Sequence, residues 1–432
     1  MKQKQKIHGL IDFIQSSPSP YHAVCNMVVR LRESGFLELK EKDLWELAEE
    51  GKYFVIRGDS SIIAFKLGKD RAIDPGFRIV GAHTDSPGFK VRPNPDCKFQ
   101  NYLTLGVEVY GSPILEAWFD RDLSLAGRIS FIGESGEFET ALLDFKRPVA
   151  MIPNLAIHLT PKNKERKAVN PQKEIVPLFY QFPKSDKSKK LTFADCLKEE
   201  LQRQKSIKAE KILDYDLLFY DQQKPQVIGF NDRFLAGARL DNLVSCYCGL
   251  NAIIESKNSK TLVLVCNDHE EIGSRTYIGA AGPFLESLLQ RVCEGVENLH
   301  RHIAGSMLVS ADNAHGIHPN YSDRHDEQNA PLLNGGVVLK VNANQRYATD
   351  SNVGGRFRQL CHSGKIPIQS FVNRSDLNCG STIGPITATA LGMQTLDVGI
   401  PTFAMHSIRE LCGVDDIDYL QRSLTQFYSL SN

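Results

Sequence analysis

The residues of this sequence that could do chemistry are histidines and carboxylates that follow short apolar runs. His83 and Asp85 follow the run 77–80, in the order His-Thr-Asp. Because the side chains of a strand alternate with a period of two, both point to the same side, and Asp85 can orient the imidazole of His83 for metal binding. Taken alone, the pair could equally be an ordinary strand end, since lone histidines usually have structural roles.

Two adjacent glutamates, Glu270 and Glu271, follow the apolar run 262–266, directly after Asp268 and His269. Two carboxylates at a buried strand end repel each other, and burying each costs free energy unless a cation compensates the charge. A metal ion would supply that cation. One glutamate could bind the metal while the other acts as general base on a metal-bound water.

Three further candidates occupy comparable places in the sequence. Asp241 opens a predicted helix, where aspartate is also a common N-cap. Asp312 follows the apolar run 307–310, and His406 follows another apolar run. Mixed histidine and carboxylate ligands suit zinc, manganese or cobalt, and a shared aspartate suits two such ions. Together the candidates outweigh the structural explanation that each has alone.

Two residues are candidates for contact with a substrate. Lys340 lies inside the apolar run 337–341, where a lysine is rarely buried without a partner. That partner could be a carboxylate of the substrate or a resident Asp or Glu in an ion pair. His315 belongs to a group of histidines in polar loops, for which we expect hydrogen-bonding roles, and we expect it to contact substrate.

The elements that must position these residues are short β-rich runs alternating with helical stretches, in residues 1–92 and 230–432. This alternation predicts an α/β sheet with helices on its faces, which builds its sites at strand ends. Residues 93–229 contain period-two runs and predict an inserted β-rich domain. The lysine-rich run 162–190 is predicted to be a solvated loop.

Composition excludes several classes of protein. The 432 residues include 51 basic and 51 acidic ones, so the clustered basic excess of a nucleic-acid binder is missing. No apolar stretch is long enough to cross a bilayer. The basic N-terminal stretch is followed by residues 7–14, in which His8 and Asp12 interrupt what would have to be the apolar core of a signal peptide. We therefore expect a cytoplasmic protein that binds neither nucleic acid nor membrane.

Five motifs resemble those of the M18 family of metalloaminopeptidases, the aspartyl aminopeptidase group. They are Val80-Gly81-Ala82-His83-Thr84-Asp85-Ser86-Pro87, Gly237-Ala238-Arg239-Leu240-Asp241-Asn242, Asp268-His269-Glu270-Glu271-Ile272-Gly273-Ser274, Ser310-Ala311-Asp312-Asn313-Ala314-His315 and Pro401-Thr402-Phe403-Ala404-Met405-His406-Ser407. The resemblance runs essentially end to end and includes Asn154-Leu155-Ala156-Ile157-His158 in the inserted domain. Matches of several residues at five separated places are highly specific.

The resemblance implies roles for the candidates. It implies two divalent ions in each subunit, zinc or alternatively manganese or cobalt, with Asp241 as the bridging ligand. The implied ligands are His83, Asp241, Glu271, Asp312 and His406. Glu270 would be the general base and Asp85 the residue that orients His83. His158 would reach the active site of a neighbouring subunit, where it could bind substrate or act as a supplementary metal ligand.

The resemblance also implies an activity and an assembly. The expected fold is an α/β/α sandwich with an inserted dimerisation domain, and dimers are expected to form a tetrahedral dodecamer. The expected activity is removal of N-terminal residues, with Asp and Glu preferred, from peptides with a free N-terminus, and it favours a substrate carboxylate as the partner of Lys340. Two alternatives stay open: a deacylase or carboxypeptidase with the same two-metal arrangement, and a non-catalytic assembly or cargo protein.

Overall fold

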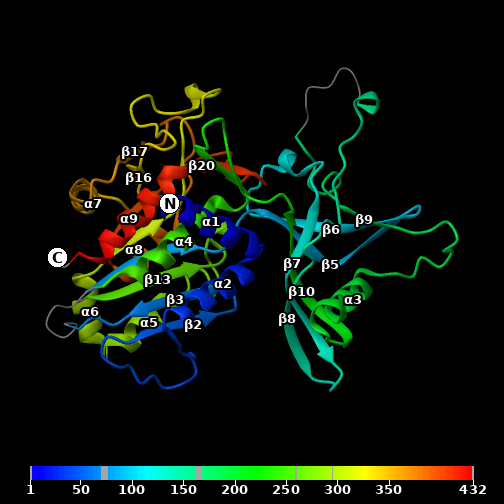
Figure 1. Cartoon of the computed structure of the whole chain (residues 1–432), viewed down its shortest axis with the longest axis horizontal. Coiled ribbons are helices and arrows are strands. Elements are labelled where there is room, and N and C mark those ends of the chain that lie inside the picture. The colour runs from blue at the N-terminus through cyan, green and yellow to red at the C-terminus, as the bar shows by residue number, and fades with distance from the viewer. Residues whose placement is uncertain (1, 70–75, 161–167, 258–259, 294, 431–432) are drawn as a thin grey trace. The chain divides into compact units, whose positions relative to one another are not determined.

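The structure is a computed structural model and describes residues 2–69, 76–160, 168–257, 260–293 and 295–430 (Figure 1). Its contacts divide the chain into two compact units. Unit 1 is discontinuous and consists of Met1–Ser86, Pro225–Met405 and Glu410–Asn432. Unit 2 consists of Pro87–Lys224 together with the short segment His406–Arg409. Both chain ends, blue and red in Figure 1, therefore belong to unit 1.

The main sheet of unit 1 has nine strands in the described residues, in the spatial order β1-β2-β3-β13-β4-β14-β18-β16-β17. Their bounds are β1 (Leu37–Glu38), β2 (Lys52–Arg57), β3 (Ser61–Lys66), β4 (Phe77–His83), β13 (Thr261–Asn267), β14 (Met307–Ala311), β16 (Val337–Val341), β17 (Ile368–Val372) and β18 (Gln394–Gly399). The central strand β4 is parallel to both of its neighbours, β13 and β14. Parallel strands end at the same edge of a sheet, so the segments that follow these three strands are brought together.

Helices cover both faces of this sheet (Figure 1). One face packs against α1 (Lys2–Ser16), α2 (Pro20–Glu33), α4 (Leu240–Glu255), α7 (Ser351–Ser363) and α9 (Val414–Tyr428), and the other packs against α5 (Phe284–Cys293) and α6 (Val296–Ala304). The remaining helix of unit 1 is α8 (Ile383–Leu391).

The residues of β4 show how the sequence produces this layering. Val80 and Ala82 belong to one hydrophobic cluster, whereas Phe77 and Ile79 belong to the other. Strands buried on both faces have near-continuous apolar sequences, which is the pattern of runs from which the sheet was predicted. The predicted α/β class with helices on both faces of the sheet is confirmed.

A second, smaller sheet of unit 1 has the order β11-β12-β20-β19-β15. Its strands are β11 (Gln226–Ile228), β12 (Phe234–Gly237), β15 (Ala314–His315), β19 (Pro401–Phe403) and β20 (Glu410–Gly413). The antiparallel pair β12 and β20 places Gly237 opposite Glu410. Since β12 leads into the segment that carries Asp241, this pairing fixes the approach of that segment to the main sheet.

Unit 2 contains a six-stranded sheet in the order β8-β7-β10-β5-β6-β9, whose pairs are antiparallel. Its strands are β5 (Gly88–Phe99), β6 (Tyr102–Tyr110), β7 (Leu123–Gly133), β8 (Phe138–Asp144), β9 (Leu178–Gln181) and β10 (Ala209–Asp221). The unit also contains the helix α3 (Phe193–Lys205), which begins with a capping box between Thr192 and Asp195. No helix had been predicted there, although the Thr-x-x-Asp pattern was visible in the sequence.

The lysine-rich run and the absence of a membrane span were both predicted from the sequence. The lysine-rich run 162–190 was predicted to be a loop, but β9 lies within it, and residues 161–167 are outside the described part of the chain. The described residues also contain four short 3-10 turns: η1 (Leu115–Trp118), η2 (Ile157–Leu159), η3 (Glu270–Ile272) and η4 (Ser322–Arg324). Among the described helices, none combines the length and the apolar sequence required to span a bilayer.

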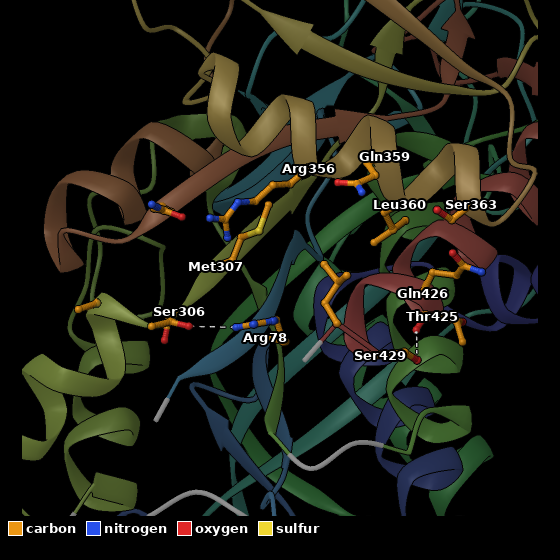
Figure 2. Close-up of a pocket in the computed structure, with 14 residues that line it drawn as sticks. Arg78, Ser306, Met307, Arg356, Gln359, Leu360, Ser363, Thr425, Gln426 and Ser429 are labelled. Carbon is orange, nitrogen blue, oxygen red and sulfur yellow. Dashed lines mark hydrogen bonds between the residues drawn. The ribbon is translucent and has the colours of Figure 1, made fainter. Parts of the chain in front are cut away.

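Unit 1 has a cavity of about 980 Å³ at the amino-terminal ends of its central strands (Figure 2). Arg78, Met307 and Gln394, at the starts of β4, β14 and β18, line it together with Arg356 of α7. None of the residues predicted to do chemistry lines this cavity. The predicted chemistry belongs to the opposite, carboxyl-terminal edge of the sheet.

Candidate metal centre

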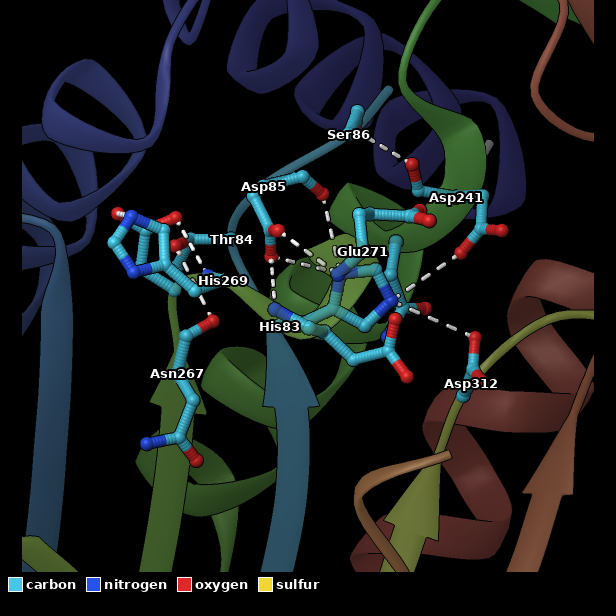
Figure 3. A network of polar contacts seen from close by, with 12 residues as sticks. His83, Thr84, Asp85, Ser86, Asp241, Asn267, His269, Glu271 and Asp312 are labelled. Atoms are coloured by element: carbon cyan, nitrogen blue, oxygen red, sulfur yellow. Dashed lines mark hydrogen bonds and ion pairs between the residues drawn. The ribbon is translucent and has the colours of Figure 1, made fainter. Parts of the chain in front are cut away.

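His83, the last residue of β4, is 1% exposed and has a carboxylate beside each ring nitrogen (Figure 3). Its Nδ1 lies 3.3 Å from Asp85 Oδ1 and 3.1 Å from the Asp85 carbonyl oxygen. On the other side of the ring, Nε2 lies 3.5 Å from Asp241 Oδ1 and 3.6 Å from Asp312 Oδ1. His83 and Asp85 therefore lie side by side, as expected, although β4 ends at His83 and Asp85 lies beyond it. Nε2 is directed at two further carboxylates.

Asp85 also holds the two glutamates in place. Its carboxylate accepts hydrogen bonds from the backbone N–H groups of Glu270 and Glu271, at 3.2 and 3.1 Å. The glutamates form the turn η3, which follows β13 after Asn267, the residue paired in register with His83. One buried carboxylate thus fixes both the histidine ring and the backbone of the acidic pair.

Asp241 occupies an unusual position at the start of α4. The N-cap of this helix is Arg239, and Asp241 lies inside the first turn with non-helical dihedral angles of −82° and 104°. The peptide bond between Asp241 and Asn242 is cis. The Asp241 N–H donates to Glu410 Oε2 at 3.0 Å, and its carbonyl oxygen accepts from Ser86 Oγ at 2.6 Å. The alternative that Asp241 serves as an N-cap is therefore wrong, because its side chain is directed at His83 instead.

Asp312 follows β14 and is 9% exposed. Its Oδ2 lies 3.2 Å from Lys340 Nζ, and this ammonium also donates to the Asn313 carbonyl oxygen at 2.9 Å. The resident ion pair, one of the two partners considered for Lys340, is thus present. Burial by itself would raise the pKa of Asp312, but the charges of Lys340 and His83 hold it below its usual value.

The centre offers two groups of possible metal ligands among the described residues of unit 1. In each group, one donor atom per residue lies within 4.8 Å of the others. The first group consists of His83, Glu270 and Glu271, and the second consists of His83, Asp241 and Asp312. Both combine an imidazole nitrogen with carboxylate oxygens, which is the donor chemistry that zinc accepts in hydrolytic sites.

The electrostatics of the centre are those of crowded carboxylates. Burial raises the pKa of Glu270 to about 8, and Asp312, Asp85 and Asp241 add to this effect while His83 opposes it. Burial, followed by Asp241, also raises the pKa of Glu271 well above its usual value. Burial would lower the pKa of His83, but Asp241, Asp312 and Asp85 outweigh it and raise that pKa. A divalent cation among these groups would compensate their charge, so the residues fit a metal ion.

Three further predicted site residues belong to other elements. His406 begins the segment His406–Arg409 of unit 2, and its Nδ1 lies 3.1 Å from the Ser112 carbonyl oxygen, so its role as a ligand stays a prediction. His158 is exposed in the turn η2 of unit 2. His315 is exposed at the end of β15, where its ring lies 5.9 Å from that of Phe371.

Several residues that support the centre were missed from the sequence. Glu410 and Ser86 bind the backbone of Asp241, Asn242 donates to the Ala311 carbonyl oxygen at 2.8 Å, and the Tyr347 ring lies 5.1 Å from Lys340 Nζ. Of these residues, only Glu410 could have been noticed in the sequence, because it is a charged residue beside the apolar residues of β20. The others are polar residues in loops and helix starts, where such residues are common.

Curated relatives match nearly the whole chain. A probable M18 family aminopeptidase 2 from Ectopseudomonas mendocina (strain ymp) is 51% identical over 427 residues, which are 99% of each chain. A protein of the same description from Pseudomonas putida (strain KT2440) is 53% identical over 420 residues, which are 97% of each chain.

Solved structures and a family model agree with these relatives. The cryo-EM structure of the Ape4 and Nbr1 complex matches with a TM-score of 0.94 and 39% identity, covering 99% of this chain and 86% of that chain. The S. cerevisiae mApe1 dodecamer matches with a TM-score of 0.84 and 29% identity, over 98% and 95% of the two chains. The model of the aminopeptidase I zinc metalloprotease family (M18) matches residues 13–428. The chain therefore belongs to the M18 family of zinc aminopeptidases.

Proposed function

We propose that this aminopeptidase removes N-terminal residues from peptides, with Asp and Glu preferred, by a mechanism that uses two divalent ions and Glu270 as general base. The observation that carries the proposal is the position of His83. Its Nε2 faces Asp241 and Asp312, and His83 also forms a group of possible metal ligands with the two glutamates. Together these groups offer more donors than a single tetrahedral ion needs, which supports two ions. Zinc is the proposed metal, with manganese or cobalt as alternatives.

The proposed division of labour follows from the contacts. His83, Asp241, Glu271 and Asp312 would hold the ions, with Asp241 bridging them and His406 as the fifth ligand. When bound, the ions would polarise the scissile carbonyl and lower the pKa of the attacking water. Glu270 would take the proton of that water and return it to the leaving amine, while Asp85 holds the Glu270 backbone in place.

Selectivity for acidic N-termini is assigned to Lys340. Its ammonium already contacts Asp312, so a substrate carboxylate would share this cation with the resident one. The test is Lys340→Met, which should reduce the ratio of activity on N-terminal Asp to activity on N-terminal Leu. Because the variant also removes the partner of Asp312, bound metal must be measured alongside. Loss of metal with an unchanged ratio would make Lys340 a residue of the metal centre only.

Assembly and location are part of the same proposal. We infer that unit 2, the inserted part of the chain, mediates dimerisation, that dimers form a tetrahedral dodecamer, and that the protein is cytoplasmic. A dodecamer is the form given for the similar mApe1 structure. His158, exposed in unit 2, would contact substrate in the active site of a neighbouring subunit, with a role as supplementary metal ligand as the alternative.

The proposed function is tested by measuring metal content together with activity on peptides that begin with Asp, Glu or Leu. We expect close to two ions per chain at full activity, loss of activity on chelation, and recovery when zinc is returned. N-acylated copies of the same peptides should not be cleaved. Cleavage of the acylated peptides would favour a deacylase, cleavage from the C-terminus a carboxypeptidase, and absence of turnover in the metal-loaded protein an assembly or cargo role.

A further inference from the structure

Asp241, the proposed bridging ligand, is held differently from the proposed ligands that the main sheet carries. His83 is the last residue of β4, and Asp312 follows β14 directly, with its N–H donating to the Val398 carbonyl oxygen of β18 at 2.8 Å. Hydrogen bonds of the sheet therefore fix the backbone of both. Asp241 lies beyond the end of β12 and has non-helical dihedral angles inside the first turn of α4. Its position depends on contacts with neighbouring segments.

Hydrogen bonds to three neighbouring segments hold the backbone around Asp241. Its carbonyl oxygen accepts from Ser86 Oγ at 2.6 Å (Figure 3), and the adjacent Asn242 Nδ2 donates to the Ala311 carbonyl oxygen at 2.8 Å. Ser86 belongs to the segment that follows β4, and Ala311 is the last residue of β14. The third bond runs from the Asp241 N–H to Glu410 Oε2, at 3.0 Å. Of these three partners, Glu410 is the charged one.

Glu410 is itself buried and fixed. It is the first residue of β20, is 2% exposed, and lies opposite Gly237 in the antiparallel pair of β12 and β20. On its other side, β20 is paired with β19. Burying a carboxylate costs free energy of desolvation that a neutral acceptor would largely avoid. A glutamine side chain could accept the same N–H, so the hydrogen bond alone does not require a charge at this position.

A negative charge at this position has a use if the residue that it holds binds a cation. Hydrogen bonds to an ionised acceptor are roughly twice as strong as those between neutral groups. The partners of metal ligands fix the orientation of those ligands and tune the metal. Glu410 can do both, because it restrains the backbone of Asp241 and places a carboxylate one hydrogen bond away from the residue whose side chain lies 3.5 Å from His83 Nε2.

We propose that Glu410 is a positioning residue that holds Asp241 in place for metal binding, and that its hydrogen bond and its charge both raise the affinity of the centre for a divalent cation. Glu410 acts through Asp241 and is not itself assigned as a ligand. The proposal rests on the proposed function, in which Asp241 is a ligand, and adds to it the element that fixes this ligand. Metal affinity should thus depend on a residue 169 positions away from Asp241 in the sequence.

The experiment measures the zinc affinity of full-length variants by competition with a chromophoric chelator. Glu410→Gln keeps an acceptor oxygen but removes the charge, and we expect it to weaken zinc binding about 10-fold, whereas Glu410→Ala removes both and should weaken it about 100-fold. Because the defect lies in metal binding, saturating zinc should largely restore the kcat of Glu410→Gln. Asp416→Asn is the matched control, since Asp416 is also a buried carboxylate of unit 1 that accepts backbone N–H groups, those of Asn334 and Gly336. It should change stability but neither zinc affinity nor kcat.

The visible spectrum of the cobalt-loaded protein reports on ligand geometry without turnover, and it should change in Glu410→Ala but not in Asp416→Asn. If the wild-type protein binds no divalent cation, or if Asp241→Asn leaves zinc affinity unchanged, the proposed metal centre itself has failed. If Asp241→Asn weakens binding while Glu410→Gln binds zinc as tightly as the wild type, the role of Glu410 is overturned, whether or not Glu410→Ala folds. Equal weakening in Asp416→Asn would also overturn it, because the effect would then come from a general loss of stability.

Discussion

Glu200 in unit 2 is buried among arginines, whereas Glu270 in unit 1 stands among other carboxylates. Glu200 is 3% exposed and accepts from Arg147 at 2.9 and 3.0 Å and from Arg203 Nε at 3.2 Å. Burial would raise its pKa, but the arginines lower it to about 2. At Glu270 burial acts in the same direction, and the neighbouring carboxylates reinforce it, so that its pKa is raised to about 8.

The difference separates a structural carboxylate from a functional one. Arg147 and Arg203 complete the surroundings of Glu200, and nothing further is needed for the charged form to be stable. The group around Glu270 carries several carboxylates for each cation, which costs free energy unless a divalent ion is bound. Strongly perturbed acids that share a site are more often functional than structural, and this comparison can be tested by substitution.

The largest effect is expected at the acidic pair of unit 1. Glu270→Gln should keep the metal and lose about 10²–10⁴-fold in kcat, since an amide cannot take the proton of the attacking water. Glu271→Gln should instead weaken metal binding. Turnover at saturating zinc and the metal bound after dialysis measure the two outcomes, and an exchange of the two phenotypes would reverse the roles assigned to the pair.

The next effect concerns the contribution of unit 2 to catalysis. A His158→Ala subunit should lose about 10²-fold or more in turnover if the imidazole stabilises the reacting peptide across a subunit interface. Mixing it with a metal-deficient His83→Ala subunit should restore activity that neither parent has, because one site of the hybrid would be complete. Hybrids that assemble and stay inactive would show that His158 does not act in trans.

A smaller effect is expected for the structural carboxylate. Glu200→Gln should lower the free energy of unfolding by about 1–3 kcal/mol and leave kcat unchanged, because it leaves two arginines without their charged partner. Glu199→Gln, an exposed neighbour, is the control. Since the pKa of Glu200 is lowered to about 2, the stabilisation is present above pH values near its ordinary pKa and is lost as the pH falls toward 2. Denaturant titrations at several pH values would measure it, and equal stability of both variants would contradict a structural role.

The smallest effect is expected at Asp416, a buried acid of unit 1 outside the metal centre. It accepts from the Asn334 and Gly336 N–H groups at 2.5 and 2.9 Å, and burial raises its pKa to about 7. The unfolded chain releases this proton near its ordinary pKa, so stability should fall as the pH rises from there through 7. Asp416→Asn should reduce this slope by about 1 kcal/mol per pH unit between about pH 5 and about pH 7, measured by denaturant unfolding. An unchanged slope would assign the pH dependence to other groups.

Local patterns were sufficient to predict much of the main sheet. The strand predicted at 337–341 is observed as β16 with the same bounds, and the helix predicted from Asp416 is part of α9. Asp85 lies beside His83, as predicted, although β4 ends at His83 and Asp85 lies beyond the strand. In each case the deciding information lies within a few adjacent residues. The helix α3 shows that such a signal can also be overlooked, since its capping box at Thr192 was present in the sequence.

The sequence by itself determined the α/β class, the family and the set of acidic and histidine residues, because strand period and residue type are local properties. Tertiary structure alone decided which of these residues meet. Lys340 pairs with Asp312, 28 residues away, because the sheet places β18 between β14 and β16, with Asp397 of β18 opposite both Lys340 and Ser310. Glu410 binds the Asp241 backbone across 169 residues because β20 pairs with β12. The pKa shifts also depend on the tertiary structure, because they follow from burial and from the neighbouring charges that folding brings within a few ångströms.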